Sequence, residues 1–485
     1  MARRFISNII FFSVILGIPA SAFAGENMAV ATTPMNLTGH WVGYLAIAIF
    51  SIAYVLAMLE EVTELRKSKP MVLAASLIWA FISVIYVNNG MSELSGQSFR
   101  MALEGFAELF LFIMVSMAYL NAMEDRGIFE NLRIWLLSKS FSYRQLFWIT
   151  GWMSFFLSSV CNNLTTALLM GAVVLAMGKG NKRFVGIACV NIVVATNAGG
   201  SFSPFGDITT LLVWQKGVVP FTSFYSLLIP AMVNFALPAG LMHFWVPKEQ
   251  PAAAIEEPMM KRGGIIMIVL FLLTIITAVC FENFLHLPPA AGMLMGLTYL
   301  KFFSYYLQMT ADKFTDQQNR LYADQMEMPP DLLGKQDKHD FDVFEKVAHL
   351  EWDTLLFFYG VMMSVAGLSF LGYLGFASNF LYDQIDPTVA NILVGIFSAF
   401  IDNGTIMYAV LTMHPDISQG QWLLVTLTAG VGGSLLAIGS AAGVGLMGQA
   451  KGLYSFSTHL KWMPLILIGY FGSIGVHFLL NQRFF

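Results

Sequence analysis

A short polar stretch places ion-binding side chains between two hydrophobic runs. Residues 398–405 read Ser-Ala-Phe-Ile-Asp-Asn-Gly-Thr, and the apolar runs around them, 392–401 and 406–413, are short. Because a helix needs about 20 apolar residues to cross a bilayer, we expect a hairpin that enters the membrane and turns back at Asn403-Gly404. The oxygen-bearing side chains gathered at this tip are Ser398, Asp402, Asn403 and Thr405.

A near-copy of this stretch, residues 158–165, reads Ser-Ser-Val-Cys-Asn-Asn-Leu-Thr. Ser158 pairs with Ser398, Asn162 with Asp402, Asn163 with Asn403 and Thr165 with Thr405. A second element follows each copy: Gly199-Gly200-Ser201 aligns with Gly432-Gly433-Ser434, and Gly206-Asp207 with Gly439-Ser440. Two pairs in the same order predict an internal repeat, and broken hydrophobic segments at matching positions indicate the midplane binding site of a secondary transporter.

These residue types suit the binding of a hard cation. Na+ prefers oxygen from carboxylates, hydroxyls, amides and the carbonyl groups of broken helix ends. We expect Asp402 and Asn163 as Na+ ligands. Full burial raises the pKa of a carboxylic acid by up to about 3 to 5, which lets protons compete with Na+ for it. The ion-binding or proton-coupling candidates are Asp402, Asn403, Thr405, Ser398, Asp207, Asn162, Asn163, Thr165, Ser158, Ser201, Ser434 and Glu108.

Several of these residues also have a structural interpretation. Asp402 could cap the hairpin turn, Asp207 could cap a helix that starts at the next residue, and Asn162 could be a plain turn residue. Glu104 and Glu108 lie one helical turn apart. Glu104 suits the outer boundary of the membrane, whereas the deeper Glu108 could relay protons.

The composition is that of a polytopic membrane protein. Of the 485 residues, 57% are hydrophobic and 12% charged, and the mean hydropathy is +0.67; soluble proteins average about 25% charged. No basic patch suggests nucleic acid. The three cysteines lie in apolar runs, so we expect small buried hydrophobes. We find no nucleophile paired with a base and no phosphate-binding glycine loop, which argues against an enzyme, and we expect no cofactor.

Loop charges predict the topology. Residues 1–24 have the basic start, apolar core and small-residue exit of a signal peptide. Basic loops that follow the first span and flank the first hairpin should be cytoplasmic. One of them, at 126–144, precedes that hairpin, and the polar stretch 88–100 is expected to be an external loop. Counting from a periplasmic start gives ten spans and two hairpins that enter from opposite faces, as an inverted repeat requires. The fold class is therefore all-α, with re-entrant hairpins and broken helices at the midplane.

The expected domains follow from this count. The signal peptide, 1–24, precedes a first membrane repeat, 25–246, with its hairpin at 145–177 and its broken helix at 184–214. A cytoplasmic linker, 247–264, leads to the second repeat, 265–485. That repeat contains a cytoplasmic loop at 306–351, a hairpin at 391–414 and a broken helix at 422–447.

Longer motifs carry a family resemblance. They lie at 59–70, 104–110, 161–166, 197–210, 351–360 and 402–405. Together they resemble the NhaD-type sodium/proton antiporters, of the ion transporter superfamily, from about residue 41 to the C-terminus. The resemblance implies a homodimer whose protomers have a scaffold domain and a moving transport domain. Dicarboxylate carriers of the superfamily have Ser-Asn-Thr at both tips, so the added acid, Asp402, suits a cation better than a dianion.

We therefore expect a carrier of the bacterial inner membrane that exchanges Na+ and Li+ for H+ and serves pH and salt homeostasis. Na+, Li+ and H+ are substrates, and the lipid bilayer is a partner. The mechanism would be alternating access with competition at a buried carboxylate. The alternatives are a sodium-coupled organic-anion carrier or an arsenite permease of the same superfamily. A channel fits titratable acids at re-entrant tips less well.

Overall fold

The computed structural model describes residues 34–139, 141–178, 181–250, 260–310 and 343–485, and every regular element in them is a helix. Eight of these helices are long and apolar enough to cross a membrane. The predicted all-α membrane class is confirmed. The proposed signal peptide and most of the cytoplasmic loop at 306–351 lie outside the described residues.

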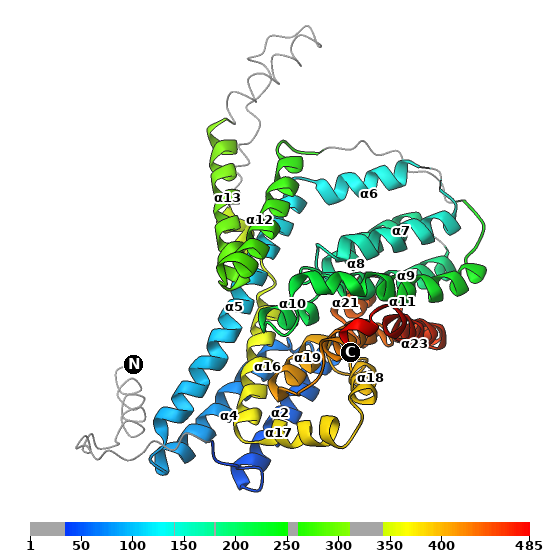
Figure 1. The fold of residues 1–485 in the computed structure, drawn as a ribbon. Helices are drawn as coiled ribbons and strands as arrows, with labels where there is room; N and C mark the ends of the chain where they lie inside the picture. The colour runs from blue at the N-terminus through cyan, green and yellow to red at the C-terminus, as the bar shows by residue number, and fades with distance from the viewer. Residues whose placement is uncertain (1–33, 140, 179–180, 251–259, 311–342) are drawn as a thin grey trace, which may run out of the picture.

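One set of helices, here called the first helix group, forms an elongated assembly on the left of Figure 1. Within it, α16 and α2 pack on α4, and α12 and α5 pack on α13. Its members are α2 (Trp41–Met58), α4 (Ser68–Asn88), α5 (Ser92–Asp125), α12 (Gly264–Leu285), α13 (Pro289–Met309) and α16 (Trp352–Phe370). The short helices attached to it are α3 (Glu60–Thr63), α15 (Val343–Ala348), α17 (Tyr373–Ser378) and the π-helix η4 (Asn379–Asp383).

The remaining helices, here called the hairpin group, lie on the right of Figure 1. The first hairpin consists of α7 (Tyr143–Ser158) and α8 (Asn163–Met177), and the second of α18 (Pro387–Phe397) and α19 (Asn403–Met413). The other members are α9 (Lys182–Gly200), α10 (Ile208–Gln215), η1 (Phe221–Leu227), α11 (Leu228–Met242), η2 (His243–Trp245), α20 (Gln419–Gly432), η5 (Ala437–Gly439), α21 (Ala441–Gln449), α22 (Phe456–Leu460), α23 (Met463–Leu480) and η6 (Gln482–Phe484). The helix α6 (Ile128–Ser138) connects the two groups and packs on α8.

The two broken helices form the centre of the hairpin group. Every residue of α9 from Phe184 to Gly200 is buried, and α20 is buried from Trp422 to Gly432. Each hairpin packs along one of them, since α7 contacts α9 and α18 contacts α20. Lipid-facing surface lies elsewhere: Ile265, Val269 and Ile276 on α12 are more than half exposed, as suits side chains in contact with hydrocarbon.

Pairs of helices lie at the positions of both predicted hairpins and both predicted broken helices, with α18 starting four residues before the expected limit. Two other features differ from the sequence prediction. The stretch 88–100, expected to be an external loop, is mostly helical because α5 begins at Ser92 and runs for 34 residues, about 50 Å at 1.5 Å per residue. The expected cytoplasmic loop at 126–144 contains α6, whose Phe129, Ile134 and Leu136 are buried. Charged residues between these apolar positions hid its helical period.

The predicted ten spans compare with eight long apolar helices in the described part of the chain. Two of the ten predicted spans are missing from these eight helices. One is α13, which is long enough but not apolar enough to count as a membrane span. The other is the broken helix made of α20 and α21, each of which is too short by itself. The number of crossings therefore stays a prediction.

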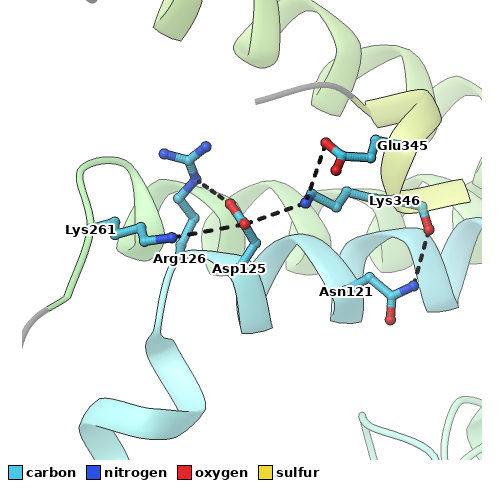
Figure 2. A network of polar contacts seen from close by, with 6 residues as sticks. All are labelled: Asn121, Asp125, Arg126, Lys261, Glu345 and Lys346. Carbon is cyan, nitrogen blue, oxygen red and sulfur yellow. Dashed lines mark hydrogen bonds and ion pairs between the residues drawn. The ribbon is translucent and has the colours of Figure 1, made fainter. Parts of the chain in front are cut away.

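A polar network ties together the end of α5, the start of α12 and the short helix α15 in the first helix group (Figure 2). The Asp125 carboxylate pairs with Arg126 at 3.3 Å, with Lys346 at 3.3 Å and with Lys261 at 3.9 Å. The Asn121 amide donates to the carbonyl oxygen of Lys346 at 3.0 Å. Burial lowers the pKa of the Arg126 guanidinium, and the Asp125 charge opposes this effect. One carboxylate thus holds three segments together.

Substituting Asp125→Asn should destabilise the first helix group, because partly buried cations lose their counterion. We expect a cost of about 1 to 3 kcal/mol, seen as a melting temperature several degrees lower in detergent. The control is Glu130→Gln, because the Glu130 carboxylate is 53% exposed in its pair with Arg133 and such surface pairs contribute little. Equal melting temperatures for the two variants would contradict this account.

Candidate functional site

The second limb of each hairpin begins with the same kind of cap. Asn162 accepts a hydrogen bond from the Thr165 backbone N–H at 2.8 Å, and Asp402 accepts one from Thr405 N–H at 3.3 Å. Such caps satisfy backbone donors that a helix start leaves free. Asn162 and Asp402 therefore occupy equivalent positions, as their alignment predicts.

The breaks of the two long helices also match. Asp207 caps α10 by accepting from Ile208 N–H at 2.7 Å, and Ser440 caps α21 by accepting from Gly443 N–H at 3.3 Å. The backbone angles of the two caps are almost equal, with φ −140° and ψ 151° at Asp207 and φ −142° and ψ 150° at Ser440. The two halves thus repeat in structure at these positions.

One serine fastens each hairpin to its broken helix. Ser158 donates to the carbonyl oxygen of Thr196 at 2.7 Å, and Ser398 donates to that of Ala429 at 2.7 Å. Glycine makes the close approach possible. A methyl group added at Gly432 would overlap the carbonyl oxygen of Gly395, and one added at Gly199 would overlap that of Phe155.

Both tips and the first break border one cavity of about 100 Å³. The candidates that line it are Asn162, Asn163, Asp207, Asp402 and Asn403. Inside it, the Asn403 amide donates to the Asp207 carboxylate at 2.8 Å, and both side chains are buried. This hydrogen bond joins residues from the two halves of the chain, 196 positions apart.

The seven other candidates do not border this cavity. Thr405 lies next to it, with its hydroxyl 3.4 Å from Asp402 Oδ2. The hydroxyls of Ser201 and Ser434 donate to the carbonyl oxygens of Asn197 and Val431, both at 2.7 Å. Ser158 and Ser398 are used in the same way, as described above. Thr165 takes part in the Asn162 cap, and Glu108 lies on α5 within the electrostatic influence of Glu104 and Lys216.

Sequence reasoning did not select several residues that belong to this region. The Asn197 amide donates to the Ser440 hydroxyl at 3.0 Å, which links the two breaks. Its Oδ1 is buried and has no hydrogen-bond partner in the described part of the chain. Glu351 and Thr354 border the cavity where α16 begins. Asn197 and Glu351 are the first residues of two of the long motifs, at 197–210 and 351–360, and this position is the sequence feature that could have identified them.

Apolar side chains form most of the cavity wall, and two carboxylates, those of Asp402 and Asp207, border it. Asp402 and Asp207 lie close enough for their charges to interact. Within the described chain, no lysine or arginine lines the cavity. Such a pocket attracts a small cation and disfavours an anion.

Comparison with known proteins shows that this chain is similar to membrane transporters. Residues 54–430 match the sequence model of the citrate transporter family, CitMHS. The chain is 52% identical over 473 residues to the Na(+)/H(+) antiporter NhaD of Alkalimonas amylolytica, covering 98% of both chains. It is 51% identical over 463 residues to the Na(+)/H(+) antiporter NhaD of Vibrio cholerae, covering 94% of this chain and 97% of the other. Sodium/proton antiporter 1 of Arabidopsis thaliana is 28% identical over 421 residues, or 83% of this chain and 66% of the other.

The close contact at Gly432 predicts a strong mutational effect. Gly432→Ala should prevent α18 from packing on α20, giving little monodisperse protein or a stability loss of several kcal/mol, because the added methyl has no room. Gly475→Ala, in helix α23, is the matched control, since nothing lies within 4 Å of a methyl group there. Size-exclusion profiles and melting temperatures measure both variants. A Gly432→Ala protein as stable as the control would show that the packing differs from this description.

Proposed function

The chain belongs to the NhaD family of Na+/H+ antiporters and to the citrate transporter family, and from this we propose that it exchanges Na+, and also Li+, for H+ across the bacterial inner membrane. The observation that carries the proposal is the single cavity in which Asp402, Asp207 and Asn403 meet. Na+, Li+ and H+ are substrates here, and the exchange needs no cofactor.

The chemistry of the cavity favours a cation. Carboxylate and amide oxygens from both tips replace the hydration shell of a small hard ion, and about 100 Å³ holds such an ion with a few waters. We propose Asp402 and Asn163 as Na+ ligands, with Asp207, Asn162 and Asn403 completing the site. Thr405, Thr165, Ser158, Ser398, Ser201 and Ser434 support it from the hairpin turns and helix breaks.

Exchange follows from competition at the carboxylates. Two nearby negative charges in a low-dielectric site are costly, so either a metal ion or a proton must offset them. Because Na+ and H+ compete for the same oxygens, binding of one displaces the other. We propose that the hairpin group moves relative to the first helix group only when it carries Na+ or H+. The site then opens to each side in turn, and each Na+ that crosses is exchanged for H+. We propose the deeper acid on α5, Glu108, as a proton relay outside the central site.

The cavity also suggests which side the site faces. Its lining runs from the buried Asp207 to Glu351, an exposed residue just before α16. Loop charges place this end of α16 on the cytoplasmic side. We therefore infer an inward-facing arrangement. The inverted repeat and the association of two copies stay predictions from the sequence and the resemblance.

One second function has an observation in its favour. The match to the citrate transporter family leaves open sodium-coupled transport of an organic anion. The two carboxylates in the cavity would repel such an anion. The discriminating measurement is a pH change in everted vesicles on addition of Na+ alone, with no organic anion present.

Removing either acid should abolish exchange. For Asp402→Asn and Asp207→Asn we expect Na+-dependent H+ flux in everted vesicles to fall at least about tenfold, because losing a charged ligand costs more than about 1.4 kcal/mol. Asp416→Asn is the matched control, since Asp416 is exposed beyond the end of α19. Full activity in both site variants would remove these acids from the exchange site.

The inward-facing arrangement predicts a sidedness of labelling. In a background without Cys161, Cys189 and Cys280, we expect Thr354→Cys to react with an impermeant thiol reagent in everted vesicles, and Na+ to slow the reaction. Asn89→Cys, exposed beyond the other end of α4, should react only in right-side-out vesicles. Labelling of Thr354→Cys from the same side as Asn89→Cys would refute the assignment.

A further inference from the structure

Two opposite charges lie on the outer face of α5 in the first helix group. Arg100 and Glu104 are one helical turn apart, and both side chains are exposed. Neither forms an ion pair or a hydrogen bond with any residue that the structure describes. In Figure 1 the first turns of α5 lie at the lower left, on the side of the molecule away from the hairpin group. These two charges are therefore outside the ion site.

The contacts of α5 place both charges at membrane depth. The ring of Phe99, which precedes Arg100, lies 5.3 Å from the ring of Trp79. Trp79 lies near the midpoint of α4, a helix that is long and apolar enough to cross a bilayer. Arg100 is therefore level with the middle of a span. Glu104 lies about 6 Å further along α5, deeper than the outer boundary that its sequence position suggests.

Charges at this depth need a partner. An ionisable side chain inside the membrane is costly, and such residues almost always pair with one another or face protein. Because Arg100 and Glu104 have opposite charges, a second copy of the same surface offers each of them a counterion. In a two-fold symmetric contact, Arg100 of one chain meets Glu104 of the other, and the same pair forms again across the axis.

The surface beside the two charges suits close packing of a helix. A groove of about 560 Å³ between α4 and α5 has Arg100 in its wall. Ser76, Ala80 and Gly96 also line it, and small residues let helices approach closely in membranes. A methyl group added at Gly96 would meet nothing within 4 Å. Met101, which follows Arg100, is 71% exposed and adds apolar contact area.

We propose that the outer face of α5, together with the adjoining groove, binds the same face of a second copy of this chain, and that Arg100 and Glu104 pair reciprocally across the two-fold axis. A phospholipid phosphate would pair with Arg100 but would leave Glu104 without a cation, whereas a second copy satisfies both charges. The inference does not depend on the proposed exchange function. It assigns the contact to the first helix group.

The test measures the mass of the purified full chain in detergent by size-exclusion chromatography with light scattering. We expect the wild type to be a dimer. Arg100→Glu and Glu104→Arg each bring like charges together, and the dissociation constant of the dimer should rise about tenfold or more. The matched control is Arg183→Glu, at an exposed position in the first turn of α9, which should leave the dissociation constant unchanged.

Exchanging the charges gives a sharper result. The double variant Arg100→Glu/Glu104→Arg should dimerise as the wild type does. A mixture of the two single variants should also form dimers, because one chain then offers two acids and the other offers two cations. Pairing of the two positions within one helix does not explain dimers in the mixture.

A monomeric wild type, single variants that dimerise like the wild type, or a mixture that stays monomeric would overturn the proposal. If the charge variants do not fold, Gly96→Phe is measured in the same way, because it fills the groove where the chain itself leaves space. Its control is Gly475→Phe, which has equal space on α23. Dimers of Gly96→Phe as tight as those of Gly475→Phe then overturn the contact.

Discussion

Every backbone N–H and C=O group at membrane depth must find a partner within the protein, because hydrocarbon offers none. This constraint is severe at four places in the chain, the two hairpin tips and the two helix breaks, where regular helix stops inside an apolar environment. Asn162, Asp402, Asp207 and Ser440 cap the helices that restart there. Ser158 and Ser398 donate to carbonyl groups of the broken helices beside them. Other features of the site depend on these hydrogen bonds.

The same caps explain why function and structure share residues. Asp402 satisfies the start of α19 and also presents a carboxylate to the cavity, and Asp207 does the same at α10. The structural and ligand interpretations of these acids are therefore compatible. A capping acid is held in one orientation, which is what an ion site requires of its ligands. The Asn403 amide then brings the two capped ends together through Asp207.

Division into two helix groups gives the site a boundary along which it could move. Within the hairpin group, helices pack so closely that only glycine fits at some contacts, as where Gly432 lies against Gly395. Between the groups, the second tip donates a backbone hydrogen bond to the Tyr54 hydroxyl, and α19 packs on α16 and α17. Tight packing favours rigid movement of the hairpin group as a unit, whereas a few polar contacts can be exchanged at low cost. In the proposed exchange, ion binding at Asp402 would change the charge at this boundary.

The sequence alone determined the membrane class, both hairpins, both helix breaks and the pairing of Asn162 with Asp402. These follow from the length of apolar runs, from glycine and asparagine at turns, and from duplication, all of which are local properties. It did not reveal the helical stretch from Ser92 or the helix α6, because charged and polar residues there masked the helical period. Only the tertiary structure decided that Asn403 donates a hydrogen bond to Asp207 and that Tyr54 meets the second tip. Those contacts join residues hundreds of positions apart, and no local pattern encodes which distant side chains packing will bring together.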